Sequence, residues 1–149
     1  MNLCDPYTVS RDDYVYQSGT LNGQVLCVVS AIAVLQTLGA PGAFERLHGI
    51  GRRLRNGIDE ICQRRSIEAK TYSDGPMCFL AFCATPIVDY RTSQAANSAK
   101  LLAFHQALLD RGVFIMPGSK AYLSTAHTEA DIDSALNAVD DAFAALNFR

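Results

Sequence analysis

The feature that most constrains this chain is the run Val25–Leu38, in which nearly every residue is apolar or small. Its length and its leucine and alanine content favour a helix over a strand, although valine and isoleucine are also frequent. Gly39 and Pro41 follow the run and are typical of helix ends. Because such a helix has no polar face to turn toward water, most of its surface has to be covered. The run therefore predicts a long buried helix and a fold that packs around it.

The next segment, residues 42–66, has the clearest helical periodicity in the chain. Gly49, Gly51 and Gly57 each lower its intrinsic helix propensity by roughly 1 kcal/mol, so packing has to hold it. The face opposite the apolar stripe carries six arginines with acidic residues between them and no interleaved aromatic residues. We interpret that face as solvated rather than as a phosphate or RNA site. The apolar stripe repeats at steps of three and four residues and consists of Phe44, Leu47, Ile50, Leu54, Ile58 and Ile61.

Four short apolar segments are predicted to be strands. The first two flank the Asp74-Gly75 turn signal, and the second of them is apolar throughout, as expected of a central strand. The other two follow Gly112 and are separated by a Gly-Ser-Lys turn. The expected strands cover residues 67–71, 77–83, 113–117 and 121–127.

Two further helices complete the prediction. One covers residues 97–111, after a long loop at 84–98 of a length that is usually functional or mobile. The last begins after Thr128, which is expected to be the N-cap, with Asp131 as a shortened capping-box partner. The order of elements predicts an α+β fold, with a small antiparallel or mixed sheet of about four strands covered by helices and preceded by the long buried helix. We expect a leader or connector at residues 1–19 and a single domain at 20–149.

The composition narrows the classes of protein to which this chain can belong. The length of 149 residues fits one domain, and a hydrophobic content of 49% with a net charge of −2 excludes a disordered chain. An acidic isoelectric point of about 5.8 disfavours nucleic acid as a partner. The sequence has no apolar stretch of 18 residues, and its start lacks the features of a signal peptide. We therefore expect no membrane partner and a cytoplasmic location.

The cysteines and histidines do not form a recognisable site in the sequence. An odd number of cysteines without a secretory signal indicates reduced thiols, and the spacing lacks the ligand pairs of a zinc site. His127 is expected to end a strand or cap a helix rather than to bind a metal. No known nucleophile, metal or nucleotide motif occurs, so an independent cysteine or histidine enzyme finds no support. Four cysteines lie in apolar runs and are predicted to be small buried hydrophobic residues: Cys27, Cys62, Cys78 and Cys83.

One stretch has the chemistry of an anion site. Residues 16–23 read Tyr-Gln-Ser-Gly-Thr-Leu-Asn-Gly and precede the long apolar helix. The hydroxyl of Thr20, the neighbouring backbone N–H groups and the positive end of a helix can all favour an anion. The alternative from the residues alone is that Thr20 is an ordinary helix N-cap.

The same stretch resembles a known family. Tyr-Gln-Ser-Gly-Thr-Leu-Asn-Gly followed by an apolar helix is similar to the YQAGTLSGNP-type segment of class III, fold-type I aminotransferases, which use pyridoxal phosphate (PLP). The glutamate-1-semialdehyde aminomutase subgroup is the most similar. Three more segments resemble that family in the same order, so that the resemblance covers about residues 14–147: they are residues 42–61, 108–118 and 122–136.

The resemblance implies a fold and a set of binding residues. Members of this family have a large domain that carries the cofactor lysine and a small C-terminal domain, and they act as dimers. The threonine that matches Thr20 reaches the PLP phosphate of the partner subunit, Gly19 would allow close backbone approach, and Ser18 would assist. This chain departs from the family pattern where Gln24-Val25 stands in place of Asn-Pro.

The resemblance also implies a missing part. The cofactor lysine of the family would precede residue 1, and none of the three lysines, Lys70, Lys100 and Lys120, lies in a matching segment. We therefore expect a C-terminal part of such an enzyme with no catalytic residue and no metal of its own, which binds no PLP alone. Its expected partners are a second copy or a large domain. The alternative is a free-standing interaction or ligand-binding module that reuses the fold, since the apolar run at 25–38 then needs a new partner.

Overall fold

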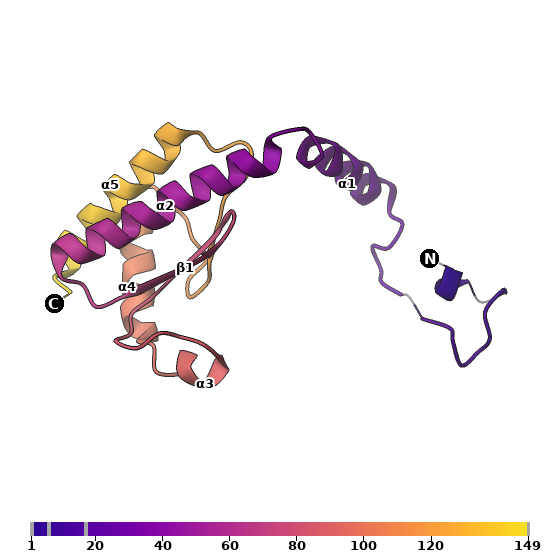
Figure 1. Ribbon diagram of the computed structural model, residues 1–149, viewed down its shortest axis with the longest axis horizontal. Helices are drawn as coiled ribbons and strands as arrows, with labels where there is room; N and C mark the ends of the chain where they lie inside the picture. The colour runs from indigo at the N-terminus through magenta and orange to yellow at the C-terminus, as the bar shows by residue number, and fades with distance from the viewer. Residues whose placement is uncertain (1, 6, 17, 149) are drawn as a thin grey trace. The chain divides into compact units, whose positions relative to one another are not determined.

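The computed structural model describes residues 2–5, 7–16 and 18–148, and Figure 1 shows its helices and strands. Pro6 of the expected leader and Gln17 of the expected anion motif lie outside the described residues. The described chain divides into two compact units, Met1–Ala40 and Pro41–Arg149. The boundary expected after residue 19 stays a prediction.

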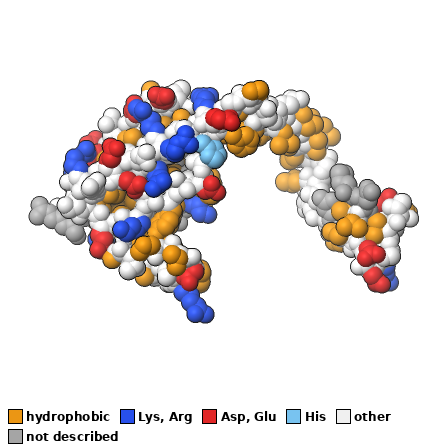
Figure 2. All heavy atoms as spheres, in the orientation of Figure 1, with side chains coloured by type: hydrophobic (Ala, Val, Ile, Leu, Met, Phe, Trp, Pro, Cys, Tyr) orange, Lys and Arg blue, Asp and Glu red, His pale blue; other side chains and the backbone are white. Residues whose placement is uncertain are grey.

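The first unit contains a short 3-10 helix, η1 (Asn2–Cys4), a series of turns and the helix α1 (Val25–Leu38). The expected helix therefore forms, with Gly39 as its C-cap. Its expected burial is not found within this chain, because α1 has no buried residue and Val25 is 73% exposed. Figure 2 shows hydrophobic side chains gathered at the surface of this helix. An apolar run predicts that its helix must be packed against other polypeptide. The run does not show which segments provide that packing.

No single described helix is both long enough and apolar enough to cross a membrane, and α1 and the next helix, Ala43–Arg65, meet the length and composition criterion only as a bent pair. With 14 residues, α1 is shorter than the roughly 20 residues that a spanning helix needs.

The second unit is built on α2 (Ala43–Arg65), with Gly42 as its N-cap and Ser66 as its C-cap. The predicted stripe is buried from Leu47 onward. Phe44 is the exception: it is 53% exposed, because it lies in the first turn, ahead of the first buried position.

The glycines of α2 mark where other elements approach it. A Cβ atom on Gly51 would overlap the backbone oxygen of Gly75 in the turn that follows residue 74. A Cβ atom on Gly57 would lie 2.5 Å from a methyl carbon of Leu136 on α5 (Glu129–Leu146). The low helix propensity of these positions is therefore offset by close packing, as the sequence required.

Ion pairs fix the direction in which α2 and α5 pack. Arg53 donates to Asp133 at 2.7 Å, and further along both helices Arg64 and Arg65 share Asp140. Contacts that advance together along both helices show that α2 and α5 run parallel. In Figure 1 the two helices lie side by side and end near each other.

The sheet is antiparallel, with the order β1-β2-β3: β1 (Lys70–Asp74), β2 (Met77–Ala81) and β3 (Ala121–Tyr122). The turn falls at the Asp74-Gly75 signal, but the first strand lies later than the expected residues 67–71. Asp74 pairs with Met77, so that the connection consists of Gly75 and Pro76 alone, with Gly75 at φ +54°.

The sheet has three strands where about four were expected. Residues 113–117 form no strand, and the strand expected at 121–127 is reduced to β3. A strand needs hydrogen-bond partners, and residues 113–117 have none in the ladder although their pattern is apolar. The loop expected at 84–98 contains a short helix, α3 (Tyr90–Ser93), which begins with a capping box between Asp89 and Thr92.

The remaining helices close the core as expected. Asn97 caps α4 (Ser98–Leu109), and Thr128 caps α5 in a capping box with Asp131. An aromatic cluster joins α4 to α5: Phe104 stacks on Phe143 with ring centroids 4.6 Å apart. The α+β architecture is thus confirmed, with its core among α2, α4, α5 and the sheet.

Candidate functional site

The predicted anion-site residues lie in turns that precede α1. Ser18, Gly19 and Thr20 are all exposed. The backbone N–H of Asn22 donates to the oxygen of Gly19 at 2.9 Å, which closes a turn with Thr20 at its second position. Gln24 forms the next turn by donating to Leu21 at 3.2 Å.

Thr20 is not the helix N-cap, and it does not open the helix. The N-cap is Gln24, in extended backbone conformation, and α1 begins at Val25. The side chain of Gln24 makes no capping hydrogen bond. The N-cap alternative for Thr20 was therefore wrong, because two consecutive turns separate the threonine from the helix.

The local geometry requires a glycine at only one of the two glycine positions. A Cβ atom on Gly19 would lie 2.8 Å from the side-chain oxygen of Asn22, but this exposed side chain can move away. Gly23 adopts φ +76°, a left-handed conformation that is strained for other residues. The two positions keep the backbone beside Thr20 compact and accessible.

The free donors of this segment fit a phosphate group. Among the described residues the Thr20 hydroxyl has no hydrogen-bond partner, and neither do the backbone N–H groups of Thr20 and Leu21. The uncapped first turn of α1 adds further donors at the positive end of the helix dipole. Residues 16–28 include no lysine or arginine, so the segment offers neutral donors and can form part of a phosphate site.

The three lysines are far apart in the fold of the second unit. Lys70 is exposed on β1, and Lys120 is exposed in the turn before β3. Lys100 lies on α4 with its ammonium 5.4 Å from the ring centre of Phe148. Each lysine therefore belongs to a different element.

The cysteines and histidines do not form a reactive centre within the described residues. Burial raises the pKa of Cys62 and of Cys78 to about 11, so both thiols stay protonated at neutral pH. Cys83 is also buried, as expected, whereas Cys27 is exposed on α1 because the helix that carries it lacks a cover. No group of three metal-binding side chains occurs in the described part of the chain.

His127 has a structural role. Its Nδ1 atom accepts a hydrogen bond from the backbone N–H of Ser124 at 3.0 Å, and its carbonyl oxygen accepts one from Arg46. The residue therefore holds the turn before α5.

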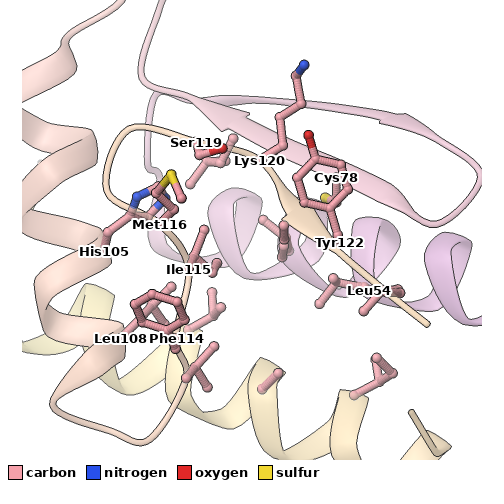
Figure 3. A pocket seen from close by; sticks show the side chains of 18 of the residues that line it. Leu54, Cys78, His105, Leu108, Phe114, Ile115, Met116, Ser119, Lys120 and Tyr122 are labelled. Carbon is pink, nitrogen blue, oxygen red and sulfur yellow. The ribbon is translucent and has the colours of Figure 1, made fainter. Parts of the chain in front are cut away.

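The second unit contains a cavity that the sequence analysis missed. Its volume is about 370 Å³, and it lies between α2, β2, α4, α5 and the segment 113–123 (Figure 3). Residues 113–116 line this cavity and do not join the sheet. No local sequence signal indicates that this segment stays outside the sheet.

Comparisons with known proteins give consistent relatives. No family model matches the sequence. Over 131 residues the chain is 36% identical to a glutamate-1-semialdehyde 2,1-aminomutase of Desulforudis audaxviator, covering 87% of this chain and 30% of that protein. An omega-transaminase from Sphaerobacter thermophilus superposes with a TM-score of 0.81 at 25% identity, over 96% of this chain and 32% of the other. The chain belongs to the class III aminotransferase family.

A third comparison supports the fold. A glutamate-1-semialdehyde aminomutase from Pseudomonas aeruginosa superposes with a TM-score of 0.77 at 18% identity, over 93% of this chain and 30% of that one. The chain spans about one third of the length of the aminotransferases that it matches.

Proposed function

We propose that these residues are the C-terminal part, including the small domain, of a PLP-dependent class III aminotransferase or aminomutase. The observation that carries the proposal is the match to glutamate-1-semialdehyde 2,1-aminomutases, which extends over 87% of the chain at 36% identity. The accessible turn at Gly19–Thr20, with donors that have no partner among the described residues, supports it independently.

In this proposal Thr20 donates its hydroxyl hydrogen to the phosphate of a PLP molecule held mainly by a partner subunit. The backbone N–H groups of Thr20 and Leu21 assist, and Gly19 and Ser18 let the backbone approach the phosphate. PLP supplies the electron sink for the reaction at the amino group when it is bound. The role of this chain is to bind and orient the phosphate end.

The lysine that binds PLP is proposed to come from outside these residues. Lys70, Lys100 and Lys120 lie on separate elements of the second unit, and none belongs to the unit that contains Thr20. The 149 residues alone are therefore proposed not to catalyse transamination and not to retain PLP. The partner would be a large domain of the same family together with a second copy of the assembled protein.

The second candidate function is an interaction module that has kept the fold and lost the cofactor. The exposed apolar surface of α1 favours it, because a helix of this kind needs a partner. The two candidates differ in one respect: the module does not need Thr20, whereas the enzyme part does.

The test supplies the missing part in trans. The chain would be co-expressed with the preceding two thirds of the D. audaxviator aminomutase, and PLP retained by the purified complex would be titrated. Thr20→Val should weaken PLP binding about 10- to 100-fold, as expected for a lost hydrogen bond to a charged group. Thr20→Ser should stay close to the unsubstituted chain.

Thr37→Val is the matched control. Thr37 lies on α1 in the same unit as Thr20, and its hydroxyl donates to Ala33 in the preceding helical turn. A complex that retains PLP equally well with Thr20→Val and with Thr37→Val would contradict the proposed role of Thr20.

A further inference from the structure

The cavity of the second unit is apolar inside and has an apolar mouth. Its floor consists of core side chains of four elements, among them Leu54, Leu108 and Ile132. Phe114 and Met116 stand at its mouth with 74% and 66% of their surface exposed. A volume of about 370 Å³ falls within the range of sites that hold small molecules.

His105 is a hydrogen-bonding side chain in the lining of this cavity. The residue is 95% buried on α4, and its Nδ1 atom accepts a hydrogen bond from the backbone N–H of Gly118 at 3.1 Å. Burial lowers the pKa of His105, so the ring is neutral at pH 7. A neutral ring that accepts at Nδ1 carries its proton on Nε2, and this N–H has no partner among the described residues.

A positively charged side chain also lines the cavity. The backbone N–H of Gly118 is hydrogen-bonded to His105, and Ser119 and Lys120 follow Gly118 in the chain. Figure 3 shows His105 next to Met116 and the Lys120 ammonium pointing away from the ring, so the flexible lysine side chain has to turn to meet a ligand at the mouth. Lys120 is exposed and forms no ion pair within the described part of the chain.

The acidic residue of the lining does not compete for that end. Asp131 is held at the start of α5, where its Oδ2 atom accepts from the backbone N–H and from the hydroxyl of Thr128, both at 2.8 Å. A second polar lining residue, His127, is hydrogen-bonded to Ser124 in the turn before α5. Among the described residues, the lining donors without a partner are the Nε2–H of His105, the hydroxyls of Ser119 and Tyr122, and the ammonium of Lys120.

We propose that this cavity binds a small aliphatic carboxylate, with its hydrocarbon chain among the core side chains and its carboxylate at His105 and Lys120. The hydrocarbon tail of the ligand fills the cavity next to apolar side chains. The carboxylate of the ligand accepts a hydrogen bond from the Nε2–H of His105. The flexible side chain of Lys120 supplies the opposite charge at the mouth. The site is independent of Thr20 and of PLP.

The test is an NMR titration of the whole chain with octanoate, with 1-octanol as the neutral probe of the same chain length. Octanoate should shift methyl signals of cavity residues such as Leu54, Leu108 and Ile132 in a saturable way. Lys120→Gln should weaken octanoate binding about two- to fivefold, in the range of an exposed ion pair, and leave octanol binding unchanged. Lys70→Gln, an exposed lysine outside the cavity, should change neither.

A second variant fills the cavity. Ala135→Leu projects three more carbon atoms from α5 into the lining and should weaken both probes at least about tenfold, while its NMR spectrum confirms that the protein is folded. Shifts that localise on α1 instead of the cavity, or octanoate binding that does not respond to Lys120→Gln or to Ala135→Leu, would overturn the proposal. If Ala135→Leu fails to fold, the shift pattern and Lys120→Gln decide the question.

Discussion

Gly49 and Gly51 lie two residues apart on α2 and meet different surroundings. A Cβ atom on Gly51 would overlap backbone atoms of Gly75, whereas nothing lies within 4 Å of one on Gly49. Gly51→Ala should lower the free energy of unfolding by about 1–3 kcal/mol, because backbone has to move. Gly49→Ala should raise it by about 0.5–1 kcal/mol, because alanine favours the helix. Urea unfolding of the two variants checks both values, and equal effects would contradict the close approach of α2 to the turn.

Asp140 makes the packing of α2 on α5 sensitive to acid. Hydrogen bonds and charges of Arg65 and Arg64 lower the pKa of Asp140. A carboxylate whose folded pKa lies below its unfolded value of about 3.9 stabilises the fold above that value and loses this contribution as the pH falls through the folded pKa. We expect the unfolding free energy of the native chain to fall below about pH 4.

Asp140→Asn should be less stable than the native chain at pH 7, and the difference should shrink as the pH is lowered toward 2. Asp141→Asn is the matched control, because Asp141 is exposed and makes no ion pair among the described residues. Unfolding by urea at several pH values measures the difference. A constant gap between native chain and Asp140→Asn at every pH would contradict the role of this pair.

At the residue scale, the sequence was informative wherever the interaction is local. The capping box of Thr128 and Asp131 and the turn at Asp74-Gly75 follow from neighbouring residues, and both were predicted correctly. Thr20 was recognised as part of a motif, but its distance from the helix start was not, because it depends on two turns whose conformation no single residue encodes. The hydrogen-bonding role of His105 was missed, since its partner Gly118 comes from a different segment.

At the scale of elements, α1 is the feature that most affects behaviour in solution. Its apolar side chains are exposed on all sides, and surfaces of this kind associate. We expect the chain to form oligomers at about 100 µM, and the double variant Leu26→Lys, Leu35→Lys to shift it toward the monomer. Light scattering after size exclusion measures the mass.

Val88→Lys is the control for that experiment. Val88 is 80% exposed in the loop before α3, so the variant adds one lysine in the second unit, against two in the double variant of α1. It should leave the mass of the oligomer unchanged. A native chain that stays monomeric at that concentration would contradict the expectation for α1.

The elements also show the limit of periodicity. The stripe of α2 is amphipathic and was predicted with its buried residues, except Phe44 in the first turn. Residues 113–117 have an apolar pattern typical of a strand, yet they form none, because a strand requires a partner in the ladder. Residues of the same segment, Phe114 and Met116 among them, line the candidate ligand site.

At the scale of the whole molecule, the central feature is that the chain spans only about one third of the length of the aminotransferases it matches. The chain has the family's fold and matches about 30% of the length of its curated relatives. Sequence motifs were sufficient to assign the family, because four segments occur in the family's order.

The most direct measurement asks whether any lysine of this chain holds PLP. The purified chain would be mixed with equimolar PLP, treated with borohydride to make a lysine–PLP bond permanent, and digested for mass spectrometry. The account predicts no stoichiometric modification, with at most sparse labelling spread over Lys70, Lys100 and Lys120. Full modification of one of these lysines would contradict the claim that the cofactor lysine comes from elsewhere.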